Sequence, residues 1–255
     1  MAEPVASAPE AAAGPVPTAP LFYKRPIALS PALHFGISLV GSGDYGFARA
    51  TNSIPLNANE FSLAVRHYPI VFTASAPSIP VAVVGSSETR NLFVDRAGRW
   101  AEGVYIPAYV RRYPFLFFEN PKEKQFVLGV DDAAPLLKES AQNRLFLNGK
   151  PTPVIERAMA FCSEYQTNIA ITRDFCKAVE DEGLLSDKEA VITLADGRQS
   201  RLTGFRVIEE KSFDKLPSKT FLRWRRRGWL HPIYLHLVSI ANWAQLVDRA
   251  AKQEN

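Results

Sequence analysis

The chain has 255 residues, which is enough for one large domain or two small ones with a buried core. Its 47% hydrophobic and 22% charged residues are typical of a globular protein, and a formal net charge of only +4 indicates no polyanionic partner by itself. The sequence holds no run of the roughly 18 apolar residues that a membrane-spanning helix needs, which argues against an integral membrane protein.

Residues 1–20 form an Ala/Pro-rich stretch with two Glu and no Lys or Arg. A secretory signal needs a cationic start and a continuous apolar core, and this stretch has neither. We therefore predict a disordered tail over residues 1–20 and a cytoplasmic protein, with export without a signal peptide left open. Residues 21–255 are predicted to form a single α+β domain.

Two segments 45 residues apart share one pattern. Residues 61–72 read FSLAVRHYPIVF and residues 106–117 read IPAYVRRYPFLF. Apolar residues at helical spacing precede a proline in each, and the residue before proline is pushed out of the helical region. Each unit therefore reads as a short helix, a proline corner and a strand, within an internal repeat over about 57–100 and 102–135. Apolar β runs bounded by turn residues predict strands at 70–73, 81–84, 92–95, 115–118 and 126–130.

The second half of the chain begins with the longest predicted element. Thr152 is the expected N-cap of a helix that Gly183 ends. Both cysteines, Cys162 and Cys176, fall in this helix about 21 Å apart, too far to bridge, and are predicted to be reduced and buried. A hairpin around Asp196-Gly197, a helix from about 217 to 227 and a last helix from 232 to about 250 follow. Clustered strands with few βαβ alternations favour α+β with mainly antiparallel sheet.

Motifs for catalysis and cofactors are weak. GSGDYG at 41–46 matches a glycine-rich phosphate loop, but no room remains for the helix that such a loop opens, so a turn is expected. The sequence contains no metal-binding spacing of His and Cys and no nucleophile motif. We predict no catalytic residues, no metal and no cofactor. Asp131-Asp132, after a predicted strand, is interpreted as a solvated turn.

The basic residues give the most serious candidate site. Nine Lys or Arg lie between Arg201 and Arg227 against three acids. Arg223, Arg225 and Arg226 stand among Trp224 and Trp229, a pattern that suits recognition of an anionic group. The competing interpretation places these arginines in the last turn of a helix, where cations offset its dipole, with the tryptophans as core anchors.

Each repeat also carries a basic pair before Tyr-Pro, namely Arg66-His67 and Arg111-Arg112. These four residues are candidate binding residues. The alternative explanation is that they end two helices, where positive charge interacts favourably with the helix dipole. A single active site rarely needs the same pair twice, so the duplication favours shared geometry.

Several segments, in order, resemble the bacterial SapC family. They include LFYKRPIALSPALHFGI from residue 21, DYGFARATNSIPL, NLFVD, YIPAYVRRYPF and GWLHPIYLHLVSIANWAQL, and the similarity runs from about 21 to 246. The resemblance implies a link to surface-layer or outer-membrane receptor systems, and it supplies no catalytic residues. We therefore expect a non-enzymatic binding or assembly protein with a protein or an anionic small molecule as partner.

Two alternatives stay open. The first is an enzyme or enzyme accessory whose small-molecule site lies between the repeats and uses Arg66, His67, Arg111 and Asp131. The second, less favoured, is nucleic-acid binding. The oligomeric state is not predicted.

Overall fold

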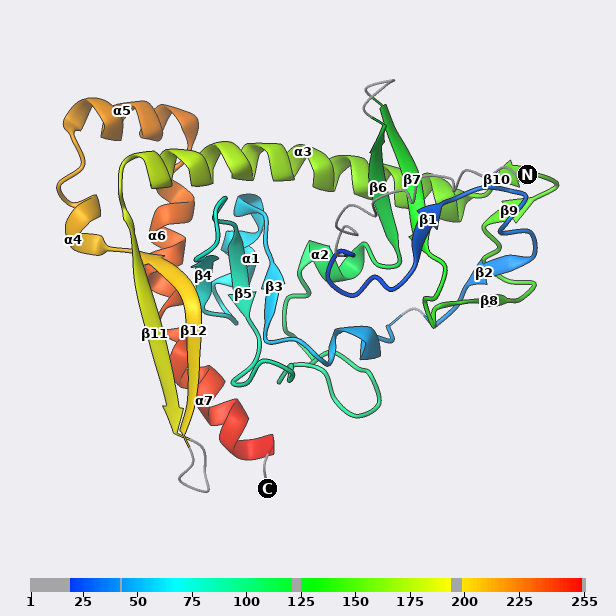
Figure 1. Ribbon diagram of the computed structural model, residues 1–255, viewed down its shortest axis with the longest axis horizontal. Helices are drawn as coiled ribbons and strands as arrows, with labels where there is room; N and C mark the ends of the chain where they lie inside the picture. Colours follow the sequence, from blue (N-terminus) through cyan, green and yellow to red (C-terminus); the bar gives the residue numbers. More distant parts are fainter. Residues whose placement is uncertain (1–18, 42, 121–124, 194–198, 254–255) are drawn as a thin grey trace, which may run out of the picture.

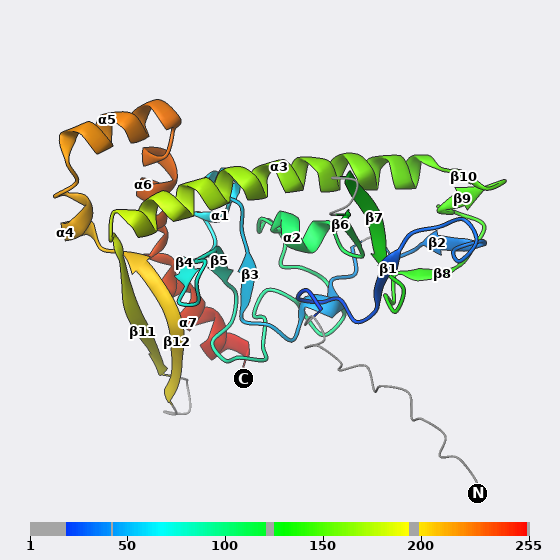
Figure 2. The same cartoon turned by 45° about the horizontal axis from the view of Figure 1, so that its top comes forward.

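A single long helix runs along most of the length of the molecule in the computed structural model, and two antiparallel sheets lie along one side of it (Figures 1 and 2). The structure describes residues 19–41, 43–120, 125–193 and 199–253. The helix, α3 (Pro153–Asp181), has 29 residues, which corresponds to about 44 Å. The fold is α+β with antiparallel sheets, as the sequence predicts.

The larger sheet lies against the C-terminal part of α3 and has five strands in the order β11-β12-β4-β5-β3. Its strands are β3 (Ser53–Pro55), β4 (Ile70–Thr73), β5 (Pro80–Val83), β11 (Leu185–Thr193) and β12 (Gln199–Ile208). Every neighbouring pair is antiparallel. The antiparallel pairing of the two strands of the predicted hairpin is therefore confirmed, whereas its predicted turn at Asp196-Gly197 lies outside the described residues.

The second sheet lies against the N-terminal half of α3 and has three strands in the order β1-β7-β6. They are β1 (Pro26–Ala28), β6 (Phe115–Asn120) and β7 (Gln125–Asp131). Two small antiparallel pairs extend this end of the molecule: β2 (Ile37–Leu39) with β8 (Leu137–Glu139), and β9 (Phe146–Leu147) with β10 (Lys150–Pro151).

The bounds of α3 follow from local signals. The Thr152 hydroxyl accepts a hydrogen bond from the Val154 amide at 3.3 Å, as an N-cap should. Gly183, with φ of 65°, lets the chain leave the helix in the left-handed region. Ile155 and Cys162 pack on the three-stranded side, whereas Phe175 and Val179 join the core of the other end. Tyr165, between them, belongs to the core that contains α1 (Phe61–Ala64), so α3 contributes side chains to three cores.

The two repeats each contain one helical turn followed by a buried tyrosine and a proline. α1 (Phe61–Ala64) leads through Tyr68 into β4, and α2 (Ala108–Arg111) leads through Tyr113 into β6. The Tyr68 hydroxyl donates to the Tyr105 carbonyl, and the Tyr113 hydroxyl donates to Asp131 Oδ2 at 2.9 Å. The Tyr113–Pro114 bond is cis, and the two strands enter different sheets.

Two expectations about this half of the chain are wrong. Asp131 is fully buried rather than in a solvated turn, because its carboxylate accepts from the Arg25 amide at 2.7 Å and from the Tyr113 hydroxyl. Burial of a carboxylate is tolerated when it is hydrogen-bonded in this way. Residues 92–95 form no strand and contribute only an isolated bridge between Val94 and Trp100.

The C-terminal region is a run of helices at the end of the molecule that carries the five-stranded sheet (Figure 1). They are α4 (Glu210–Phe213), α5 (Ser218–Arg227), α6 (Leu230–Ser239) and α7 (Asn242–Gln253). Gly228, with φ of 74°, ends α5 as predicted. The single helix predicted from 232 to 250 is wrong, because the chain turns between α6 and α7. Asn242 holds this turn by donating to the Val65 and Tyr68 carbonyls at 2.7 and 3.0 Å.

His236, a buried residue of α6, joins this helix to two strands of the larger sheet. Its Nε2 accepts from the Ile208 amide at 3.0 Å, so Nδ1 carries the proton and donates to the Ile70 carbonyl at 2.8 Å. The Ser239 hydroxyl accepts from the Ile70 amide at 3.0 Å. His236 is therefore held as a neutral ring, and burial lowers its pKa from 6.5 to about 4.

This pKa shift predicts acid sensitivity. Between about 6.5 and about 4 the unfolded chain protonates His236 and the folded chain does not, so stability falls as the pH falls through that window. We expect His236 to lower the free energy of unfolding by about 2 kcal/mol between about pH 7 and about pH 5. Urea denaturation should show this loss in the native protein and in His231→Gln, which alters an exposed histidine. His236→Gln should lack it, and an equal loss in His236→Gln would contradict the assignment.

Candidate functional site

A mainly apolar hollow lies under the middle and C-terminal part of α3. This α3 cavity has a volume of about 640 Å³. Its walls come from α3, from β3 and the segment after it, from the turn between β4 and β5, from Leu21 and from α2. Apolar and aromatic side chains dominate the lining, among them Leu56, Ile79, Tyr109, Tyr165 and Ile169.

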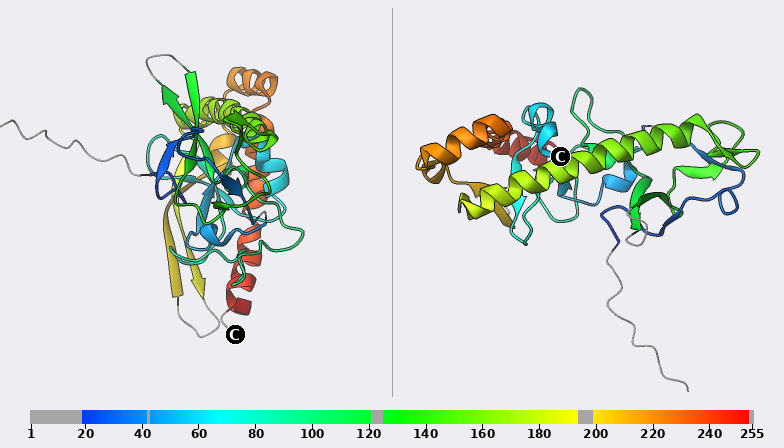
Figure 3. Two further views of the ribbon diagram at one scale, coloured as in Figure 1. Left: turned by 90° about the vertical axis from the view of Figure 1, so that its right-hand side faces the viewer. Right: turned by 90° about the horizontal axis from the view of Figure 1, so that it is seen from above.

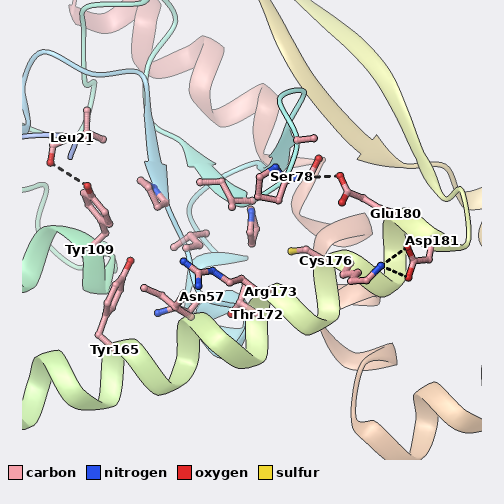
Figure 4. Close-up of a pocket in the computed structure, with 18 residues that line it drawn as sticks. Leu21, Asn57, Ser78, Tyr109, Tyr165, Thr172, Arg173, Cys176, Glu180 and Asp181 are labelled. Atoms are coloured by element: carbon pink, nitrogen blue, oxygen red, sulfur yellow. Dashed lines mark hydrogen bonds and ion pairs between the residues drawn. The ribbon is translucent and has the colours of Figure 1, made fainter. Parts of the chain in front are cut away.

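Polar contacts hold the walls of the α3 cavity onto the helix. The Thr172 hydroxyl accepts from the Ala58 amide at 2.9 Å, which attaches the 3-10 turn η2 (Ala58–Glu60) to α3. Farther along, Glu180 accepts from the Ser78 amide at 3.2 Å (Figure 4) and from Arg206 Nη2 at 2.9 Å. The cavity is thus built between fixed elements and needs no rearrangement to exist.

The two ends of the α3 cavity differ in character. At one end Tyr109 and Tyr165 face each other, and the Tyr109 hydroxyl donates to the Leu21 carbonyl at 3.2 Å (Figure 4). At the other end lies the ion pair of Lys177 with Asp181 at 2.9 Å. A ligand would therefore meet aromatic rings at one end and charges at the other.

The cysteines of α3 are unreactive at neutral pH. Both are free and buried, as the sequence predicts. Burial raises the pKa of Cys176, in the wall of the α3 cavity, to about 12, and that of Cys162 to about 11. Since the thiolate is the nucleophilic form, neither thiol suits covalent catalysis.

A smaller hollow of about 230 Å³ lies between the repeats and α3, and we call it the Glu60 cavity. Glu60 Oε1 accepts from the Tyr105 hydroxyl at 2.8 Å and from the Ala108 amide, the first of α2, at 2.7 Å. Its Oε2 accepts from the Asn57 amide at 2.8 Å. Burial raises the pKa of Glu60, although these hydrogen bonds and nearby Arg111 oppose the shift. Glu60 thus links the first repeat to the helix of the second.

A third hollow, of about 330 Å³, lies on the other side of α2, and we call it the arginine cavity. It is lined by Arg111 and Arg112 from the second repeat, by Arg157 from α3 and by Asn143, with apolar side chains between them. The Arg112 guanidinium lies over the rings of Tyr109 and Tyr165.

The structure does not gather the predicted binding residues into one site. Arg111 and Arg112 share the arginine cavity, whereas Arg66 and His67 lie beyond the end of α1 and line none of the three cavities. Burial lowers the pKa of His67, and Arg66 and Arg249 lower it further. Asp131, which the enzyme hypothesis also uses, lies outside these cavities. Its carboxylate is hydrogen-bonded to the Arg25 amide and the Tyr113 hydroxyl.

The basic residues of α5 lie at the far end of the molecule from the arginine cavity (Figure 3, right). Arg223 pairs with Glu182 at 3.2 Å, whereas Arg225 and Arg226 are exposed in the last turn of the helix. Trp224 is fully buried and Trp229 packs against the same core. The interpretation of the tryptophans as core anchors is therefore confirmed.

Sequence reasoning missed Glu60, Tyr109, Tyr165 and Arg157. A signal existed for Glu60, because Asn57 followed three residues later by Glu is a capping-box pattern, and the structure forms that box. The other three were not detectable, because each is an ordinary helical residue whose role depends on the element packed against it.

By its architecture the protein is of the α+β class, with antiparallel sheets and one long helix, α3, that lines the cavities described above. Residues 29–246 match the model of the SapC family, so the chain belongs to the SapC family. No curated protein and no solved structure matches the chain. Within the described ranges, no helix has the length and apolar character to cross a membrane.

Removal of the Glu60 carboxylate should loosen the junction between the repeats. Glu60→Ala leaves the Asn57 and Ala108 amides buried without an acceptor, so we expect the free energy of unfolding to fall by about 3 kcal/mol. Glu60→Gln should cost less, because its carbonyl still accepts from Tyr105 and Ala108. Urea denaturation measures both, with Glu164→Gln, an exposed acid of the same cavity, as the control. Equal stability of Glu60→Ala and the control would refute this role.

Proposed function

We propose that this SapC family member is a non-enzymatic binding or assembly protein whose α3 cavity holds a small, largely apolar molecule. The observation that carries the proposal is the cavity itself. Its volume of about 640 Å³ falls within the roughly 300–1,000 Å³ of small-molecule sites, and its mixture of apolar walls and a few polar groups is typical of them.

The hydrogen bonds that hold the walls of the α3 cavity in place support a ligand-binding site rather than a packing defect. Thr172 and Glu180 tie separate segments to the same helix on either side of the hollow. A cavity that exists before the ligand arrives avoids the cost of ordering its walls on binding. The aromatic end, formed by Tyr109 and Tyr165, suits a flat or aliphatic group, and the end near Lys177 suits a polar one.

An assembly role is supported by the exposed basic turn of α5. Arg225 and Arg226 are exposed and enter no ion pair among the described residues. A protein partner with an acidic surface, or an anionic small molecule, could pair with them. The link to surface-layer or outer-membrane receptor systems and the cytoplasmic location belong to this proposal. Nucleic acid is the less favoured partner.

Filling the α3 cavity should abolish binding while leaving the fold intact. Ile169→Trp places an indole in the cavity, whereas Ile171→Trp places the same group on the exposed face of the same helix. With the neutral probe Nile red, we expect saturable fluorescence enhancement for the native protein and for Ile171→Trp. Ile169→Trp should bind about tenfold more weakly or worse. Equal probe affinity in the two variants would rule the α3 cavity out as the binding site.

Charge reversal at α5 tests the assembly role. Arg225→Glu with Arg226→Glu should lower the salt concentration at which the protein elutes from immobilised polyglutamate, because two cations become anions. The loss of the helix-dipole interaction should cost only about 1–2 kcal/mol of stability. Arg96→Glu with Lys150→Glu makes the same charge change at exposed sites elsewhere. Equal elution of the two double variants would contradict a specific role for α5. Retention of the native protein on immobilised mixed DNA, lost in the α5 variant, would favour nucleic acid as the partner instead.

The alternative, an enzyme or enzyme accessory with its site between the repeats, is favoured by the Glu60 cavity. A buried carboxyl group whose pKa is raised, next to a tyrosine hydroxyl and Arg111, is a common arrangement for proton transfer. All its hydrogen bonds are satisfied within the fold, however, which favours the structural role described above. Loss of turnover of a stabilising metabolite in Glu60→Gln, with the fold retained, would favour the enzyme.

A further inference from the structure

The arginine cavity concentrates positive charge without a matching negative one. Three arginines line it, Arg111, Arg112 and Arg157, and among the described residues no Asp or Glu does. Its remaining lining is apolar or neutral, including Tyr113, Phe115 and Phe161.

Arg112 is the most unusual of the three. Its guanidinium carbon lies 4.3 Å from the centre of the Tyr109 ring, 4.6 Å from that of Tyr165 and 5.7 Å from that of Tyr23. Its Nε is buried and has no hydrogen-bond partner among the described residues. No ion pair of these residues includes Arg112.

The tyrosines around Arg112 stabilise its charge but do not neutralise it. Burial raises the pKa of Tyr23, Tyr109 and Tyr165, so all three are neutral phenols at physiological pH. Their ring faces attract the cation. A buried charge is costly unless a counter-charge and hydrogen bonds accompany it. The cage formed by the rings of Tyr23, Tyr109 and Tyr165 therefore holds the Arg112 side chain but supplies no negative charge to pair with it.

The other two arginines complete the cavity in different ways. Arg111 is fixed, since its Nε donates to the Ile106 carbonyl at 3.0 Å and its Nη2 to the Tyr105 hydroxyl at 3.3 Å. Its charge is partly shared with Glu60, which accepts from that same tyrosine. Arg157 lies on the exposed face of α3 at the rim and forms no ion pair among the described residues.

From this geometry we infer that the arginine cavity is a binding site for a small oxyanion, a carboxylate or a phosphate group. The planar fork of a guanidinium matches the paired oxygens of both groups. Arg112 would contribute a donor, its Nε, that has no partner among the described residues. Arg111 would contribute a guanidinium fixed by Ile106 and Tyr105, and Arg157 one from the exposed face of α3. The volume of about 330 Å³ accommodates a small anion or the acidic end of a larger molecule. This inference does not depend on the ligand of the α3 cavity.

The test uses inorganic phosphate and acetate as separate probes, titrated into the full chain at low salt and followed by calorimetry. We expect saturable binding of at least one probe, and the tighter one identifies the preferred oxyanion. Arg157→Gln should weaken binding about tenfold, because one charged hydrogen bond is lost. Arg96→Gln, which changes an exposed arginine outside all the cavities described above, should leave the affinity unchanged.

A second measurement locates the anion independently of these variants. In ¹⁵N-resolved spectra, the Arg112 Nε–H signal should move as the probe is added, with the same midpoint as the calorimetric titration. Arg112→Lys removes the fork and should abolish binding, and its thermal melting shows whether the variant is folded. Absence of saturable binding of both probes would overturn the inference. So would unchanged affinity in Arg157→Gln, or an equal loss in Arg96→Gln.

Discussion

The length of α3 is the constraint from which the rest of the structure follows. At 29 residues it is longer than either sheet can cover, so it rests on one core near its start and on another near its end. Between these two cores, Tyr165 packs into the core that contains α1, and Thr172 holds the Ala58 amide. All three cavities described above include residues of α3 in their lining.

Buried polar side chains connect elements that are far apart in the sequence. Glu60 joins the first repeat to α2, His236 joins α6 to β4 and β12, and Asp131 joins β7 to the segment before β1. Each accepts hydrogen bonds from backbone amides, which would otherwise be buried without partners. Such contacts are directional, so they determine how the elements sit relative to one another more strictly than hydrophobic contacts of the same size.

The two copies of the helix–proline–strand unit have diverged in their surroundings. Tyr68 and Tyr113 are both buried, but one bonds to a backbone carbonyl and the other to a carboxylate. The basic residues before them diverge further, since Arg66 and His67 lie away from the cavities while Arg111 and Arg112 line one. The two segments therefore share a local helix–proline–strand shape, and only the basic pair of the second segment, beside α3, lines a cavity.

Local features were determined by the sequence itself. The caps of α3, the glycine that ends α5, the strands after each proline and the hairpin of β11 and β12 depend on residues adjacent in the chain, whose conformational preferences act at short range. The burial of Asp131, the linkage through Glu60 and the tyrosine cage of Arg112 were decided only by the tertiary structure. Each joins side chains from elements far apart in sequence, and the free energy of a charged group depends on which of those elements surround it.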